Sequence, residues 1–212
     1  MPDQAMWLNR LLGLKPTGAR EYFADLPRLE TPRLILRKAR RSDAADIYAY
    51  ASDPEVSRYV LWDTHRSIAD SRAYIRYLRR QYYSGEPSSY VMALKDTGRV
   101  IGTVGFVRYT EENDCAEVGY SMGRDWWHQG LMTEALQAVL RLAFEEMGLH
   151  RVEARHETGN PASGRVMARC GLRQEGILRG SVWNKGRYAD VALWSILQED
   201  YAALTPQPSF RP

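Results

Sequence analysis

The sequence predicts an α+β, or mixed α/β, domain in which helices cover a mostly antiparallel, seven-stranded, twisted sheet. Three observations lead to this prediction. Seven segments have the alternation or the composition of strands. Four others have helical spacing of apolar residues or a helix-start signal. The segments follow one another in the order β-α-α-β-β-β-α-β-α-β-β, which places one strand–helix–strand unit at the centre of the chain.

The first half begins with a strand over Arg33–Arg40, where apolar and polar residues alternate. Ser42 is a candidate N-cap for the helix that follows. A loop rich in aromatic residues then leads to a second helix over Ser67–Tyr83. Three antiparallel strands joined by turn residues come next: Ser89–Lys95, Arg99–Tyr109 and Cys115–Gly123.

The second half begins with a long amphipathic helix that ends near Gly148, a residue suited to a C-terminal cap. A strand over Arg151–Glu157 follows. Asn160 and Pro161 are typical of an N-cap and a first helical position, so a short helix is expected to Gly171. The chain then predicts a final strand pair, Leu172–Trp183 and Arg187–Gln198.

The chain of 212 residues suits a single domain. We expect that domain at 30–203. It is preceded by an N-terminal extension at 1–29 with a short amphipathic helix over Ala5–Leu14, and followed by a tail at 204–212. No apolar run reaches the length of a membrane span, and the N-terminus lacks the pattern of a signal peptide.

A net charge of +3 does not indicate a nucleic-acid-binding protein, so no direct nucleic-acid partner is expected. Cys115 and Cys170 lie far apart and form no CxxC or Cys/His cluster, which argues against a zinc site and a disulfide framework. We therefore expect a cytoplasmic protein without a metal or a membrane partner. The oligomeric state stays open, a homodimer included.

The stretch RDWWHQGLMTEAL sets one glycine, Gly130, between bulky residues and the start of the long helix. A helix start presents unpaired N–H groups and positive potential, which suit a phosphate. Gly130 has no Cβ and lets an anion approach the backbone closely. The alternative is a glycine that only eases the turn, with Glu134 favouring the helix dipole.

The chain resembles the GNAT acetyltransferases, and their RimJ/RimL-like branch in particular. The segments AEVGYSMGRDWWHQGLMTEAL and GNPASGRVMARCGLRQEG carry the resemblance, and TPRLILRKARRSDAADIY, PEVSRYVLWDTHRSIADSRAYI and RYADVALWSIL support it. It extends over about residues 30–201. One departure concerns the glycine-rich loop, where Trp127 and Met132 stand at positions that the family commonly gives to Arg or Gln and to Gly or Ala.

The resemblance implies that acetyl-CoA is the co-substrate and lies between the strands Cys115–Met122 and Arg151–Glu157. Pantetheine is then expected along the first of these strands, pyrophosphate on the backbone of the glycine-rich loop, and Asn160 and Ser163 beside the pantetheine. The predicted cofactor-binding residues are Tyr120, Ser121, Met122, Trp127, His128, Gln129, Gly130, Leu131, Met132, Thr133, Asn160 and Ser163.

Acyl transfer to an amine needs a route for the amine proton and a proton for the thiolate. Glu117, a charged residue in an otherwise apolar strand, is the candidate base, and an exposed carboxylate that only aids solubility is the alternative. Ser163 is the candidate acid, with Tyr188 as its replacement and an ordinary first-turn serine as the alternative reading. Cys115 lacks a matching histidine, and direct transfer needs no covalent intermediate.

The acceptor site is expected opposite the cofactor, built by the first two helices and their loop, with Tyr59, Trp62, Trp183 and Tyr188 as candidate lining residues. The alternative is that these aromatic residues belong to the core. Aromatic residues with few fixed charges favour a protein N-terminal amine. A small-molecule amine acetyltransferase, for amino acids, polyamines or aminoglycosides, remains open, although a polycationic acceptor calls for more acids. A non-catalytic acyl-CoA-binding sensor is the third alternative.

Overall fold

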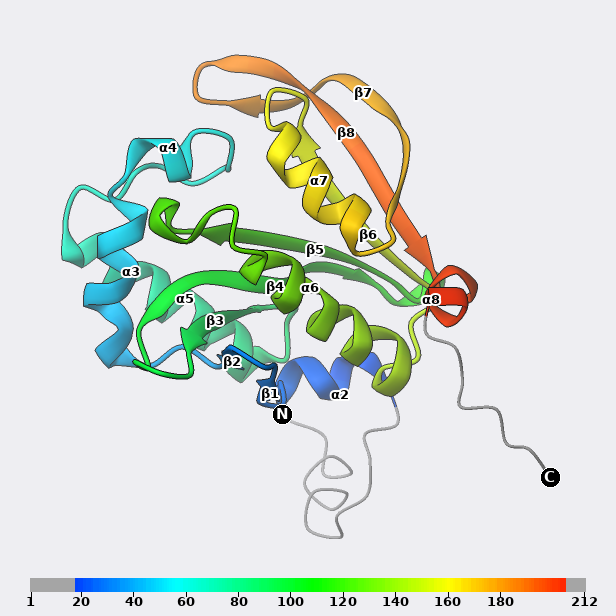
Figure 1. The fold of residues 1–212 in the computed structure, drawn as a ribbon, viewed down its shortest axis with the longest axis horizontal. Coiled ribbons are helices and arrows are strands. Elements are labelled where there is room, and N and C mark those ends of the chain that lie inside the picture. The colour runs from blue at the N-terminus through cyan, green and yellow to red at the C-terminus, as the bar shows by residue number, and fades with distance from the viewer. Residues whose placement is uncertain (1–17, 205–212) are drawn as a thin grey trace, which may run out of the picture.

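The computed structural model describes residues 18–204, and its architecture confirms the predicted mixed α/β class (Figure 1). The strands are β1 (Leu29–Glu30), β2 (Leu34–Arg37), β3 (Ser89–Leu94), β4 (Val100–Thr110), β5 (Cys115–Met122), β6 (Arg151–Glu157), β7 (Arg173–Asn184) and β8 (Arg187–Leu197). The α-helices are α2 (Ala19–Ala24), α3 (Ala44–Ala51), α4 (Pro54–Ser57), α5 (Ile68–Ser84), α6 (Leu131–Arg141), α7 (Pro161–Arg169) and α8 (Gln198–Leu204). Short 3₁₀ segments cover Arg41–Asp43, Glu111–Asn113 and Arg124–Trp126, and a π-helical turn, Leu142–Glu146, extends α6.

The sheet has eight strands in the order β1-β2-β3-β4-β5-β6-β8-β7, one more than the sequence predicts. The additional strand is β1, which pairs Leu29 with Leu36 and Glu30 with Ile35 at the edge of the sheet. Two residues are too few to show any alternation, so hydrophobic periodicity gives no sign of this strand. The short helices α2, α4 and α8 are likewise additions to the predicted order.

Strands β5 and β6 form a parallel pair that opens along its length. Cys115–Val118 of β5 pair with Arg151–Ala154 of β6, and the pairing stops there. The rest of β5 continues to pair with β4, up to Met122, and the rest of β6 pairs with β8, up to Glu157. The two strands therefore part after Val118 and Ala154, and each leaves one edge unpaired.

Helices cover both faces of the sheet. In Figure 1, α6 and α7 lie in front of the sheet and α5 lies behind it. The apolar face of α6 is fully buried, including Ala135, Leu136 and Val139. At its start, α5 has a capping box formed by Ser67 and Asp70, and it ends at Gly85, which has a left-handed backbone with φ 70°.

Helix α2 packs on the domain through Phe23, whose ring meets Phe106 edge-on at 5.3 Å between centroids. The helix expected over Ala5–Leu14 lies outside the described residues. Among residues 18–204, no helix combines the length and the apolar character that a membrane crossing requires.

Candidate active site

A pocket of about 350 Å³ lies beside the end of β5, beyond the point where β5 and β6 part. Its walls come from four places in the chain: the end of β5, the loop and first turn of α6, one side of α7 with the residues before it, and the segment of α4. The elements meet here because the parallel strands part and leave room at their carboxyl ends, where ligands bind in open α/β sheets.

The first turn of α6 faces this pocket with an open N-terminus. Gly130 is the N-cap, with φ 75° and ψ 0°, and no side chain forms a capping hydrogen bond there. His128, two residues earlier, also has a positive φ of 62°. A Cβ on Gly130 would have only the Arg33 guanidinium near it, at 3.6 Å. The turn therefore presents free backbone N–H groups with little steric cover, which favours an anion.

Two side chains hold the loop before α6 in place. Glu134 accepts hydrogen bonds from the Thr31 hydroxyl at 2.6 Å and from the Arg33 backbone N–H at 2.8 Å, and it forms an ion pair with the Arg33 guanidinium at 2.7 Å. The indole N–H of Trp127 donates to the carbonyl of Met122 at 2.7 Å. Glu134 thus anchors the segment between β1 and β2 to α6, in agreement with the structural role that its place in the first turn allowed.

Most of the residues predicted to bind the cofactor line the pocket. They are Tyr120, Ser121, Met122, Trp127, His128, Gly130, Met132, Thr133, Asn160 and Ser163. Gln129 and Leu131 do not: the Gln129 side chain donates to the Asp125 carbonyl at 2.9 Å, and Leu131 is buried in the core. Trp127 and Met132, the two departures in the loop, form part of the wall.

Two arginines that the sequence analysis did not single out also line the pocket. Arg165 and Arg169 lie one turn apart on α7, both are exposed, and neither pairs with a carboxylate among the described residues. Their i, i+4 spacing places both on one helix face. Together with the helix start, they make this wall suitable for phosphates. The spacing was visible in the sequence, but nothing there showed which face of α7 meets the pocket.

Tyr120 and Ser163 meet across the pocket. The Tyr120 hydroxyl donates to the Ser163 carbonyl at 3.0 Å and lies 2.9 Å from the Ser163 hydroxyl. Burial raises the pKa of Tyr120, so the phenol stays protonated at neutral pH. Asn160 caps α7 by accepting from the Ser163 backbone N–H at 3.4 Å. Tyr120 was expected to contribute its backbone; its hydroxyl is a further proton donor in the site.

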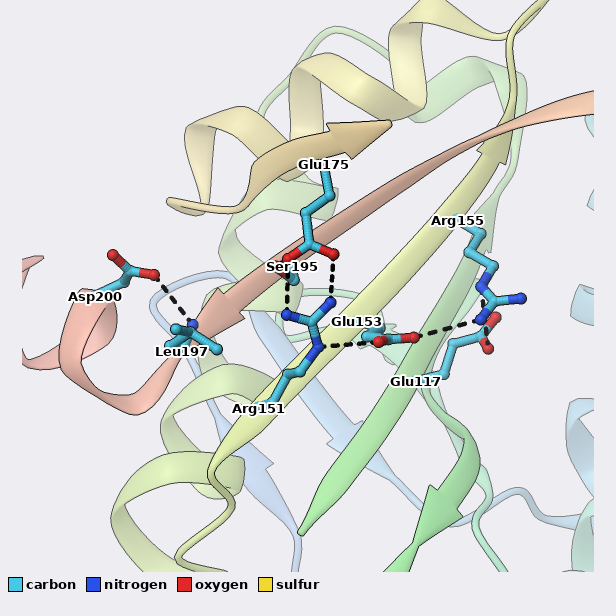
Figure 2. Close-up of polar contacts among 8 residues, drawn as sticks. All are labelled: Glu117, Arg151, Glu153, Arg155, Glu175, Ser195, Leu197 and Asp200. Atoms are coloured by element: carbon cyan, nitrogen blue, oxygen red, sulfur yellow. Dashed lines mark hydrogen bonds and ion pairs between the residues drawn. The ribbon is translucent and has the colours of Figure 1, made fainter. Parts of the chain in front are cut away.

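Glu117 lies at one end of a row of alternating charged side chains, on the face of β5 opposite the Tyr120 side chain. Figure 2 shows this row. The Arg151 guanidinium holds Glu175 with two hydrogen bonds and donates to Glu153 at 2.9 Å. The Arg155 guanidinium then approaches Glu153 at 3.4 Å and Glu117 at 3.6 Å.

The row has two consequences for the chemistry of these carboxylates. Glu117 does not line the pocket, and its side chain is 17% exposed beside the cation of Arg155. At the far end of the row, the hydrogen bonds from Arg151 lower the pKa of Glu175 to about 2. The base role of Glu117 stays a prediction, with Arg155 as a neighbour that the sequence did not reveal.

The remaining nucleophiles and bases near the site are occupied or inert. The Nε2 atom of His156 accepts a hydrogen bond from the Trp194 indole N–H at 3.1 Å, and its Nδ1 atom lies 2.7 Å from the Glu157 carbonyl oxygen. Both ring nitrogens therefore have partners within the protein. Burial raises the pKa of the Cys170 thiol to about 12 and also raises that of Cys115. Among residues 18–204, no group of three or more His, Cys, Asp or Glu has a metal-binding arrangement.

Of the four residues predicted to line the acceptor site, only Tyr59 reaches the pocket. Its ring lies against Gly159, where an added Cβ would come within 3.0 Å of the ring. Trp183 and Tyr188 stack edge-on at 4.8 Å on the β7–β8 hairpin and are 61% and 71% exposed. Tyr188 therefore does not line the pocket.

The tip of the β7–β8 hairpin is fastened to the loop after α4. The Lys185 ammonium donates to the carbonyls of Val60 at 2.7 Å and of Trp62 at 3.1 Å. At the base of the tip, the buried carboxylate of Glu157 accepts from Asn184 and Arg187. These bonds bring the aromatic pair of the hairpin and the aromatic loop to the same end of the pocket, although the sequence separates them by more than a hundred residues.

Comparison with known proteins matches this architecture to one family. The family model of the acetyltransferase (GNAT) domain matches residues 33–173. The chain is 35% identical over 174 residues to an uncharacterized N-acetyltransferase, p20, of Bacillus licheniformis, covering 82% of this chain and 98% of that protein. It is 26% identical over 190 residues to the [ribosomal protein uS5]-alanine N-acetyltransferase of Escherichia coli K12, covering 85% and 96%.

A solved structure shares the fold. It is RimL, the ribosomal L7/L12 alpha-N-protein acetyltransferase in complex with coenzyme A, with a TM-score of 0.73 at 19% sequence identity, covering 81% of this chain and 98% of that one. The parted parallel strands, the uncapped start of α6 and the match over residues 33–173 agree with one another. The chain is an acyltransferase that belongs to the GNAT acetyltransferase family.

Proposed function

We propose that this protein transfers the acetyl group of acetyl-CoA directly to the α-amine of a protein N-terminus. The observation that carries the proposal is the pocket beside the point where β5 and β6 part, which joins the unpaired end of β5 to an uncapped helix start. An extended amide chain pairs with a free strand edge as an added strand does, and a diphosphate suits the helix start. In coenzyme A, the pantetheine arm is such an extended amide chain, and the pyrophosphate that follows it is such a diphosphate.

The chemistry needs three functions from the chain. A neutral amine attacks the thioester carbonyl, a tetrahedral oxyanion forms, and the carbon–sulfur bond breaks as the thiolate leaves. Glu117 lies on the same strand as Tyr120 but on the opposite face and outside the pocket lining, and it accepts the amine proton through water. The Tyr120 hydroxyl, in contact with the Ser163 hydroxyl at 2.9 Å, returns a proton to the sulfur.

Backbone N–H groups supply both anion sites. Those at the unpaired edge of β5 stabilise the oxyanion, and those of the first turn of α6 hold the pyrophosphate. Arg165 and Arg169 add positive charge to the same wall of the pocket.

The acceptor side supports a peptide. Tyr59 reaches the pocket, and the hairpin fastened by Lys185 sets Trp183 and Tyr188 at the same end, where an extended chain can lie along aromatic surfaces. The relative from Escherichia coli is named for the alanine of a ribosomal protein. A polycationic acceptor calls for a cluster of acids, and the loop that carries Tyr59 provides few.

A thiol-release assay with acetyl-CoA tests the proposal. The acceptors are peptides that begin with Ala, Ser or Thr, the same peptides with a blocked N-terminus, and a panel of amino acids, polyamines and aminoglycosides. We expect release with the free peptides alone. Release with small amines alone supports the small-molecule alternative. Tight coenzyme binding without release over the whole panel supports a sensor.

A further inference from the structure

Helix α5 concentrates the positive charge of the molecule. Ile68–Ser84 contains four arginines and one aspartate, a net charge of +3, which equals the net charge of the entire chain. The aspartate, Asp70, accepts backbone N–H groups of Arg66 at 2.9 Å and Ser67 at 3.0 Å. The Asp70 carboxylate therefore caps the start of the helix and does not pair with its arginines. The small net charge of the whole chain conceals this local excess of positive charge on α5.

The four arginines share one face of the helix. Arg76 follows Arg72 by four residues, Arg79 and Arg80 follow Arg76 by three and four, and all four are exposed. Tyr83 lies on the same face and is 95% exposed. At 1.5 Å per residue, the face from Arg72 to Tyr83 is about 16 Å long. We call these five residues the arginine face.

The arginines of this face have no carboxylate partners. No ion pair joins any of the four, or the neighbouring Arg66, to a carboxylate of the described residues. Elsewhere, Arg33, Arg37 and Arg151 each pair with an acid at 2.8 Å or less. Like charges at i, i+4 destabilise a helix, and this face contains two such pairs, 72/76 and 76/80. Stability alone does not account for the arrangement.

The arginine face is separate from the coenzyme pocket. Helix α5 buries its opposite side, through Ser71, Ile75, Leu78 and Tyr82. It lies behind the sheet in Figure 1, whereas α6 and α7 lie in front of it. A partner bound to the arginine face therefore leaves the pocket open.

We propose that the arginine face binds RNA through its phosphate backbone. The guanidinium group is planar and matches two phosphate oxygens at once, and all four cations of α5 are arginines. The exposed ring of Tyr83, and that of Tyr77 at 55% exposure beside the face, offer stacking surfaces for unpaired bases.

Fluorescence anisotropy with a labelled stem-loop RNA tests this proposal. The full chain is titrated at salt concentrations between about 50 and 200 mM. The test variant replaces Arg72, Arg76, Arg79 and Arg80 by Gln. The matched control replaces four exposed arginines outside α5, none of them in an ion pair with a described carboxylate, by Gln with the same change of net charge: Arg99, Arg108, Arg141 and Arg179.

We expect log K for the unaltered protein to fall with log salt at a slope of about −3, as four phosphate contacts require. The test variant loses more than about tenfold in affinity at the lowest salt and most of this slope. The control variant keeps both. Tyr83→Ala weakens binding to the stem-loop but not to a fully paired duplex. Coenzyme A affinity and the circular dichroism spectrum verify that each variant is folded.

Three results would overturn the proposal. They are an RNA affinity that falls equally in both variants, a lack of RNA binding by the unaltered protein, and binding to polyglutamate in preference to RNA.

Discussion

Replacing Gly130 by Glu is the sharpest test of the proposed pyrophosphate site. The added carboxylate would lie at the uncapped start of α6, where the phosphates are expected. Two companion variants separate the contributions: Gly130→Gln adds the same bulk without charge, and Gly130→Ala adds only a Cβ. In all three, the Cβ meets nothing closer than the Arg33 guanidinium at 3.6 Å, so the Cβ itself does not clash with the protein.

The expected magnitude follows from charge and backbone conformation. A carboxylate about 4 Å from a phosphate charge, at an effective dielectric constant of about 20, is repelled by about 4 kcal/mol. That energy corresponds to a loss of roughly a thousandfold in affinity. Separately, any residue other than glycine at φ 75° costs about 1–2 kcal/mol of folding free energy. This second cost is common to the three variants and cancels when they are compared with one another.

Calorimetric titration with coenzyme A measures the affinities, and thermal unfolding measures the shared cost. Gly130→Ala is expected to bind coenzyme A within an order of magnitude of the unaltered protein, Gly130→Gln more weakly, and Gly130→Glu hardly at all. Equal affinities for the Glu and Gln variants would refute the reasoning, because charge at this turn would then be irrelevant to the ligand.

Three further predictions concern side chains of the site and of the charged row. Glu117→Gln should lower kcat more than it raises the KM for acetyl-CoA and should abolish the acid limb of the pH–rate profile, whereas Glu153→Gln, its neighbour in the row, should leave the profile intact. An unaltered profile for Glu117→Gln rules out the base role. Tyr120→Phe should lower kcat by about a hundredfold or more while coenzyme A affinity, measured by calorimetry, changes little; an unchanged kcat excludes the phenol as the acid. Because the pKa of Glu175 is about 2 in the folded protein, its stabilising effect is present above the ordinary carboxyl range and is lost as the pH falls toward 2. The unfolding free energies of the protein and of Glu175→Gln should therefore differ at neutral pH and converge in acid, and a difference independent of pH contradicts this.

The element order was largely predictable because each long element has its own local signal. The capping residues Asn160 and Gly148 and the turns between β3, β4 and β5 mark their boundaries without reference to tertiary structure. Strand β1 lacked such a signal, because two residues form a strand only when a neighbour such as β2 offers an edge.

The site was predictable in its backbone and less so in its side chains. The glycine-rich turn before α6 is local in sequence, and it lies in the pocket as expected. The contact between Tyr120 and Ser163 joins residues 43 positions apart, and the approach of Arg155 to Glu117 depends on the register of β5 against β6. Alternation along β5 placed Glu117 on the face opposite Tyr120, but it did not reveal which groups cover each face.

The single parallel pairing among the described strands also divides the sheet mechanically. Strands β1–β5 form one lobe, β6–β8 form the other, and the seam between them spans only four residue pairs. A ligand that forms hydrogen bonds with both unpaired strand edges would hold the two lobes together. At a ligand concentration of a hundred times its Kd, binding would raise the unfolding free energy of the protein by about 2.7 kcal/mol. The protein without such a ligand is then the looser form.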